Sequence, residues 1–175
     1  MAFVVSVLTS ACISTSPAPG PTIPSSPAWP TYHDPVLGYS IAYPPGWVEA
    51  DDSGTDVRKH YFANAPLDDY AISSALGDGV MVVAVLVFAF DDRCLESTYS
   101  NSAFPPINTS IDGQTATVSG SDLPTLALFD ALVRVGKNKR CFSFGTYASS
   151  REARDLSVPT FLKMLSTFKF ATAPS

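Results

Sequence analysis

The chain contains few residues whose types and spacing could do chemistry. His33 and His60 are its only histidines, and zinc sites need several nitrogen or sulfur ligands at short spacing, as in HExxH or paired CxxC, neither of which occurs. The acidic stretch 52–56 lacks the alternating ligands and the distal glutamate of a calcium loop. GxSxG, GxxxxGK[ST] and GxGxxG motifs are also absent from the sequence. Since no local context supports a serine triad around His60, we expect His60 to be a surface strand residue, and we expect no catalytic residue, no metal and no cofactor.

Cys12 has the sequence context of a lipid attachment site. Residues 1–8 read MAFVVSVL, a short apolar run, and the small residues Thr-Ser-Ala separate it from the cysteine. This order resembles the bacterial lipobox, in which the thiol takes a diacylglycerol and cleavage leaves the cysteine as the N-terminus. Thr9 stands where an aliphatic residue is usual, and no Lys or Arg precedes the cysteine; a start codon upstream would explain the missing charge and the short run. We expect a signal-peptide-like segment over 1–11 and lipid attachment, with acyl chains such as palmitate, at Cys12.

A segment rich in proline and serine follows. From residue 13 it reads ISTSPAPGPTIPSSPAWPTYHDP, and prolines without a backbone donor, together with Ser and Gly, favour an extended chain that does not pack. We expect a flexible tether over 12–33, with the folded domain over 34–172. A Pro-rich ligand for a recognition domain is the alternative for the tether. A signal-like run, a cysteine and a tether stand in the order that a lipoprotein requires, so we expect the domain on the outer face of the cell membrane.

The two remaining cysteines form one even pair. If Cys12 belongs to an export signal, Cys94 and Cys141 remain for an oxidising compartment. Cys94 follows the most apolar stretch of the chain and Cys141 lies in a later predicted strand, so the two can be neighbours in one sheet. Closing a loop of about 48 residues would stabilise the fold by about 4 kcal/mol. We expect a disulfide between them; the alternative is two buried thiols.

Charge excludes one class of partner. The formal net charge is -5 and the isoelectric point about 4.8, which gives no general attraction to nucleic acid or to anionic lipid headgroups. Acidic pairs at 51–52, 68–69 and 91–92 are dispersed along the chain, so we interpret them as solvated turn residues.

The first half of the domain is predicted to form strands. Residues 37–43 alternate large apolar with small or polar side chains, and a turn at 44–46 follows. A second strand is expected at 57–63, after a loop over 51–56. Residues 79–90 read GVMVVAVLVFAF, too short for a membrane helix and rich in β-branched and aromatic residues, which predicts a strand buried on both faces.

The second half is predicted to add strands and one helix. A turn at 111–114 leads into a strand at 115–118, and a hairpin turn at 136–139 joins strands at 126–135 and 140–147. Residues 92–102 could form a short helix, and Asn108-Thr109-Ser110, a glycosylation sequon, is expected to be loop. Ser157 is expected to cap a helix that contains Pro159 in its first turn and ends near residue 167. The pattern indicates one α+β domain with a mostly antiparallel sheet.

Three segments carry a resemblance to a known family. Residues 38–47 read GYSIAYPPGW, residues 111–116 read IDGQTA and residues 165–170 read LSTFKF; in this order they resemble the opening hairpin, the middle turn and the helix exit of PsbP-like domains. The resemblance implies an α/β/α sandwich with an antiparallel sheet, and the tether is similar to that of the family's bacterial lipoprotein branch. The family spans photosystem II extrinsic subunits and many bacterial lipoproteins, so the resemblance alone does not fix a function.

Together these features predict a non-enzymatic binding or accessory module, held at the membrane by its N-terminal lipid, that contacts a protein or an envelope component. An envelope hydrolase with an unrecognised site is one alternative, and a lipoprotein that binds a small ligand is another. A polar cluster in a deep pocket would favour the alternatives, whereas a flat, exposed apolar or aromatic patch would favour the module.

Overall fold

The computed structural model describes residues 27–53, 57–67, 76–77, 79–89, 94, 104–123 and 128–171. The signal-like segment 1–11, the lipid attachment residue Cys12, most of the predicted tether and the possible helix at 92–102 except Cys94 lie outside the described residues. The elements are β1 Thr31–Asp34, β2 Tyr39–Ala42, β3 Val48–Ser53, β4 Arg58–Ala63, β5 Met81–Ala89, β6 Ile107–Ile111, β7 Gln114–Leu123, β8 Leu128–Lys137, β9 Arg140–Ala148, α1 Arg151–Thr167 and β10 Lys169–Phe170.

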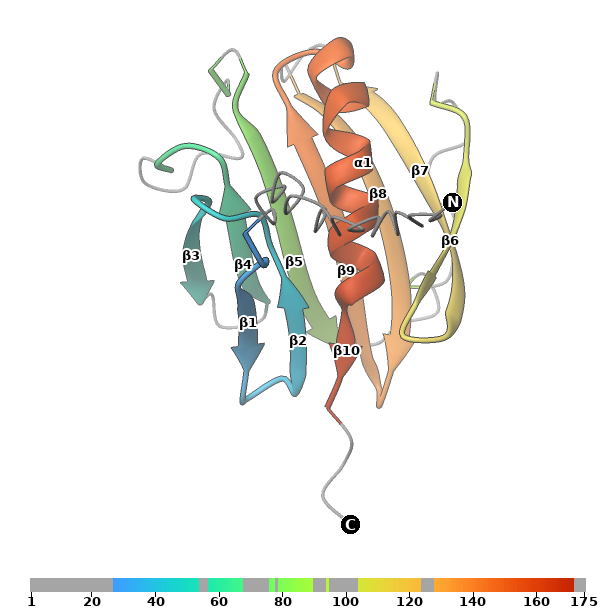
Figure 1. The fold of residues 1–175 in the computed structure, drawn as a ribbon. Helices are drawn as coiled ribbons and strands as arrows, with labels where there is room; N and C mark the ends of the chain where they lie inside the picture. The colour runs from blue at the N-terminus through green and yellow to red at the C-terminus, as the bar shows by residue number, and fades with distance from the viewer. Residues whose placement is uncertain are drawn as a thin grey trace, which may run out of the picture.

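Two antiparallel sheets and one helix make up the described fold. The large sheet has seven strands in the order β3-β4-β5-β9-β8-β7-β6, and the small sheet has three in the order β1-β2-β10. Figure 1 shows α1 and the small sheet lying over the same face of the large sheet, and α1 contacts β9, β2, β8 and β5. The predicted α+β class, with one domain and antiparallel sheets, is confirmed. The second helical layer of an α/β/α sandwich has no counterpart among the residues that the structure describes.

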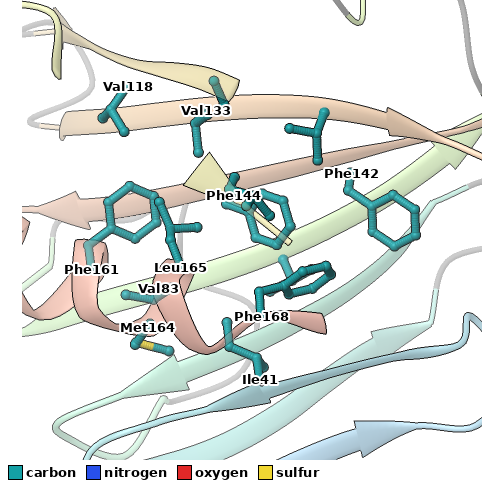
Figure 2. Packing of buried hydrophobic residues seen from close by; sticks show 14 of the residues in the cluster. Ile41, Val83, Val118, Val133, Phe142, Phe144, Phe161, Met164, Leu165 and Phe168 are labelled. Atoms are coloured by element: carbon teal, nitrogen blue, oxygen red, sulfur yellow. The ribbon is translucent and has the colours of Figure 1, made fainter. Parts of the chain in front are cut away.

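The main core lies between the large sheet and the layer formed by α1 and the small sheet. Figure 2 shows Phe161, Leu165 and Phe168 meeting Val83 and Phe144 there. All five are almost completely buried, so this contact removes much apolar surface from water and fixes the helix on the sheet.

The apolar run at 79–90 forms β5, as predicted. This strand pairs with β4 on one side and β9 on the other, and Val82, Val83, Ala84 and Val85 in succession are buried. A strand buried on both faces explains why the run is continuously apolar instead of alternating. No helix in the described part of the chain is long and apolar enough to cross a membrane.

Both predicted tight turns are present. Asp112 and Gly113 have φ values of 47° and 80° between β6 and β7, and Asn138 and Lys139 have φ values of 51° and 58° between β8 and β9. Two successive left-handed residues give the turn whose twist matches that of paired strands, so these turns set the register of both hairpins.

Three predicted boundaries between strand and loop are wrong. Strand β1 begins at Thr31, before the predicted end of the tether at residue 33, because Trp29 and Tyr32 pack against the core. Strand β3 continues to Ser53 through part of the predicted loop 51–56, since its pairing with β4 outweighs the low strand preference of aspartate. The sequon at Asn108 lies within β6, paired with β7, and not in a loop.

The predicted start of the helix is also wrong. Helix α1 begins at Arg151, and the Ser150 hydroxyl accepts a hydrogen bond from the Ala153 amide at 3.1 Å, as an N-cap does. Ser157 is buried inside the helix, where its hydroxyl donates to the Arg154 carbonyl at 2.6 Å. Pro159 therefore lies in the helix interior and not in the first turn. The predicted end near residue 167 is confirmed.

Candidate functional site

His60 occupies the centre of a site at the free edge of the large sheet. Strand register places it opposite Asp51 on β3, and its Nδ1 lies 2.5 Å from Asp51 Oδ1. An ionised carboxylate only accepts hydrogen bonds, so this contact assigns a proton to Nδ1. The histidine side chain is only 5% exposed, which corrects the expectation of a surface residue. We call Tyr32, Glu49, Asp51, His60 and Phe62 the His60 site.

Aromatic rings enclose the imidazole. The Tyr32 ring stacks on it with a centroid distance of 3.8 Å and an interplanar angle of 19°, and the Phe62 ring meets it edge-on at 4.7 Å. Tyr43 packs against Phe62 in turn, at 4.9 Å. Tyr32 belongs to the small sheet and His60 to the large one, so the site lies where the two sheets join.

The second ring nitrogen has a different environment. His60 Nε2 is buried and has no hydrogen-bond partner among the described residues. The Glu49 Oε2 atom lies 3.5 Å away, too far for a good hydrogen bond. In the neutral ring with its proton on Nδ1, Nε2 is an acceptor without a donor. A buried acceptor of this kind costs free energy until a donor reaches it.

The carboxylates influence the nearby phenols. The pKa of Tyr32 is raised to about 12, mainly by burial. The negative charges of Asp51 and Asp34 contribute to this rise. Burial also raises the pKa of Tyr43, with a contribution from Glu49. Glu49 thus acts on both tyrosines and Asp51 on Tyr32. The side chains of Glu49 and Asp51 are 45% and 52% exposed.

This geometry limits the chemistry of the site. An aspartate that orients a histidine is the arrangement of a general base, but here Tyr32 covers the ring face and Glu49 lies beside Nε2. The two carboxylates lie at opposite ring nitrogens, so they do not converge on one ion, and the described residues contain no group of three or more His, Cys, Asp or Glu that could hold a metal. The site therefore holds the Asp51 carboxylate in place through Nδ1, while the Glu49 carboxylate lies 3.5 Å from Nε2, and both carboxylates remain about half exposed.

A second polar cluster lies under α1. The Thr146 and Ser157 hydroxyls are 2.9 Å apart, and Arg154, almost fully buried, binds Asp155 through Nε at 2.9 Å while its guanidinium lies 5.0 Å from the Phe104 ring centroid. These residues pair with one another inside the fold, which gives the cluster a structural role.

The predicted cysteine pair is present. Cys94 and Cys141 form a disulfide with their Cα atoms 5.7 Å apart, and both residues are buried.

The other histidine of the sequence does not belong to the tether. His33 is part of β1, where it lies opposite Ser40 of β2.

Sequence reasoning did not single out Tyr32, Glu49 or Asp51. The spacing of Glu49 and Asp51 could have indicated them, because residues two apart on a strand share a face. His60 lies within the next predicted strand, so a hairpin between the two strands would bring it next to these acids. The contribution of Tyr32 had no local signal, since it comes from a different sheet.

Comparison with known proteins gives a structural neighbour and no family. No family model matches the sequence, and no curated protein matches it either. Among solved structures, the fold is similar to the solution structure of cyanobacterial PsbP (CyanoP) from Synechocystis sp. PCC 6803, with a TM-score of 0.49, 15% sequence identity, and coverage of 86% of this chain and 98% of that one.

Proposed function

We propose that this protein is an extracytoplasmic lipoprotein whose folded domain is a non-enzymatic binding module. Cys12 carries the lipid, the Pro-rich segment between Cys12 and Trp29 forms the tether, and the domain recognises a protein partner. The anchoring part rests on the order of apolar run, cysteine and Pro-rich segment in the sequence. The buried disulfide between Cys94 and Cys141 supports it, since such bonds persist in oxidising compartments.

The observation that carries the binding role is the construction of the His60 site. A buried, ring-stacked histidine fixes Asp51 from below, yet the carboxylates of Asp51 and Glu49 remain half exposed. A carboxylate that is already held in place, as that of Asp51 is, loses little side-chain entropy on binding, which favours recognition. The enclosed imidazole suits this positioning role better than proton transfer to a substrate.

Two experiments test the proposal. Anchoring is tested with Cys12→Ser, which should move the protein from the membrane fraction to the soluble extracytoplasmic fraction; a variant that stays membrane-bound contradicts the lipid anchor. Binding is tested with a photo-crosslinking amino acid placed at Ala50 of β3 in cells, with the same group at Glu152 of α1 as the matched control. A discrete adduct from Ala50 that is absent from Glu152 supports a binding module. Identical adduct patterns at both positions would contradict a specific interface at this edge.

A further inference from the structure

We infer that the free edge of β3 receives an extended, basic segment of the partner as an added strand, with an Arg or Lys side chain bound at Glu49 and His60. This inference rests on the proposed binding function and names the chemistry of its partner. Neither the sequence motifs nor the comparisons with known proteins point to Glu49 and His60 as binding residues.

The backbone of β3 supplies the first argument. Among the described strands β3 pairs only with β4, so no other described strand pairs with the N–H and C=O groups along the outer edge of the six residues Val48–Ser53. Such an edge is a template for a further strand unless something blocks it. Strand addition supplies main-chain hydrogen bonds, and the side chains of β3 select the partner.

Charge selects a basic partner. Asp52 already has a counterion, since its Oδ2 lies 3.0 Å from Lys59 Nζ. Among the described residues neither Glu49 nor Asp51 forms an ion pair with a Lys or Arg, although the charge of Arg58 on β4 reaches Tyr32 in the same site. Both acids keep about half of their side-chain surface in solvent. A second copy of this chain would bring the same acids to the shared edge, and like charges disfavour that pairing. A strand with Lys or Arg fits instead.

The buried nitrogen specifies where the cation binds. His60 Nε2 lacks a hydrogen bond while lying 3.5 Å from the Glu49 carboxylate. An ammonium or guanidinium has only N–H donors, so one such group can donate to Nε2 and to the Glu49 carboxylate together. The phenol ring of Tyr43 lies within the field of Glu49 and adds an aromatic surface of the kind that attracts cations.

The spacing sets the pattern of the partner. Glu49 and Asp51 share one face of β3, and in a paired strand the residues that share a face are also two apart. The matching segment therefore carries basic side chains at alternate positions. Two such contacts at an exposed edge contribute about 1 kcal/mol each, so we expect weak, salt-sensitive binding.

The test uses three synthetic peptides and the full chain carrying Cys12→Ser. The first peptide alternates Val and Arg, the second alternates Val and Glu, and the third is the Val–Arg peptide with alternate backbone amides methylated. We expect chemical-shift changes centred on β3 with the first peptide only. Glu49→Gln should weaken its binding about fivefold, and the matched helix variant Glu152→Gln should leave it unchanged.

Three outcomes overturn the inference. If the methylated peptide binds as tightly as the unmethylated one, attraction is only ionic and no strand is added. If Glu152→Gln weakens binding as much as Glu49→Gln, the charge is general and not local. If the Val–Arg peptide shifts residues away from β3 or does not bind, the edge is not the receptor. Because the protein in this test is unanchored, these failures leave the membrane fractionation and crosslinking results of the proposed function standing.

Discussion

Tyr32 stacks on His60 at 3.8 Å between ring centroids, and this contact joins two sheets that share no strand pairing. Among the described strands, β1 pairs only with β2, so side-chain packing determines its position against β4. The stack, with Phe62 beside both rings, therefore links the start of the folded domain at β1 to the acidic edge of β3.

The first prediction measures that link. Tyr32→Ala and His60→Ala should each lower the free energy of unfolding by about 1–3 kcal/mol. The double variant should lose about 1 kcal/mol less than the sum of the two, because stacked rings stabilise beyond the area they bury. Urea unfolding of the four proteins gives the coupling energy. Val36→Ala, at a residue 63% exposed, should change stability by less than about 0.5 kcal/mol. A coupling energy of zero would show that the stack does not join the sheets energetically.

The second prediction concerns alkaline pH. Burial raises the pKa of Tyr32 from 10.0 to about 12, and burial raises the pKa of Tyr39 as well. The folded state therefore favours the neutral phenols, so their stabilising contribution is complete below pH 10 and is lost as the pH rises toward 12. The free energy of unfolding should fall between about pH 10 and pH 12. Tyr39→Phe, which removes one of these groups and keeps the ring, should flatten that fall. Equal slopes in the two proteins would contradict this assignment.

Local pattern was enough for several elements. The run at 79–90 could be assigned to a central strand because β-branched residues without alternation are typical of one, and the turns at 111–114 and 136–139 could be assigned because Asp, Asn and Gly tolerate left-handed backbone. The cysteine pair could be assigned because each partner fell next to or within a predicted strand. In each case the local structure is determined by interactions between residues close in sequence, or by a residue type that permits few conformations or pairings.

The candidate site could not be predicted in the same way. The burial of His60 depends on Tyr32, which is distant in sequence and arrives through packing of a second sheet. The start of the helix was misassigned because Ser157 followed closely by Pro159 has the pattern of a cap, whereas the Ser157 hydroxyl bonds to a helix carbonyl and to Thr146 on β9. Long-range contacts decide both cases, and a single sequence does not encode them in a local pattern.

The third prediction concerns the chain exit. Asp112 accepts hydrogen bonds from Lys169 Nζ and from the Phe170 amide, both at 3.2 Å, and the Lys169 contact is the main cause that lowers its pKa from 3.8. The stabilising contribution is therefore present above about pH 4 and is lost as the pH falls through the folded-state pKa. Asp112→Asn keeps a residue that tolerates the left-handed backbone and should cost about 1 kcal/mol at neutral pH.

The control for this prediction separates the two donors. Lys169→Met removes the cation and leaves the Phe170 amide in place, and it should cost about 0.5 kcal/mol or less because Lys169 is exposed. The free energy of unfolding should also depend less on pH below pH 4 in Asp112→Asn than in the parent protein. An unchanged acid dependence would show that Asp112 is not the responsible group.

The fourth prediction concerns the disulfide. Cys94 and Cys141 are 47 residues apart in the sequence. Their bond closes a loop and so lowers the conformational entropy of the unfolded chain, which stabilises the folded state by about 4 kcal/mol in the chain-entropy model. Replacing both residues by alanine should lower the free energy of unfolding by about this amount, measured by urea unfolding. The single variant Cys94→Ala should lose a similar amount, because either change opens the loop. Tryptic peptides of the parent protein should change mass on reduction; identical masses with and without reductant would show that the bond does not form, and would remove its support for an oxidising compartment.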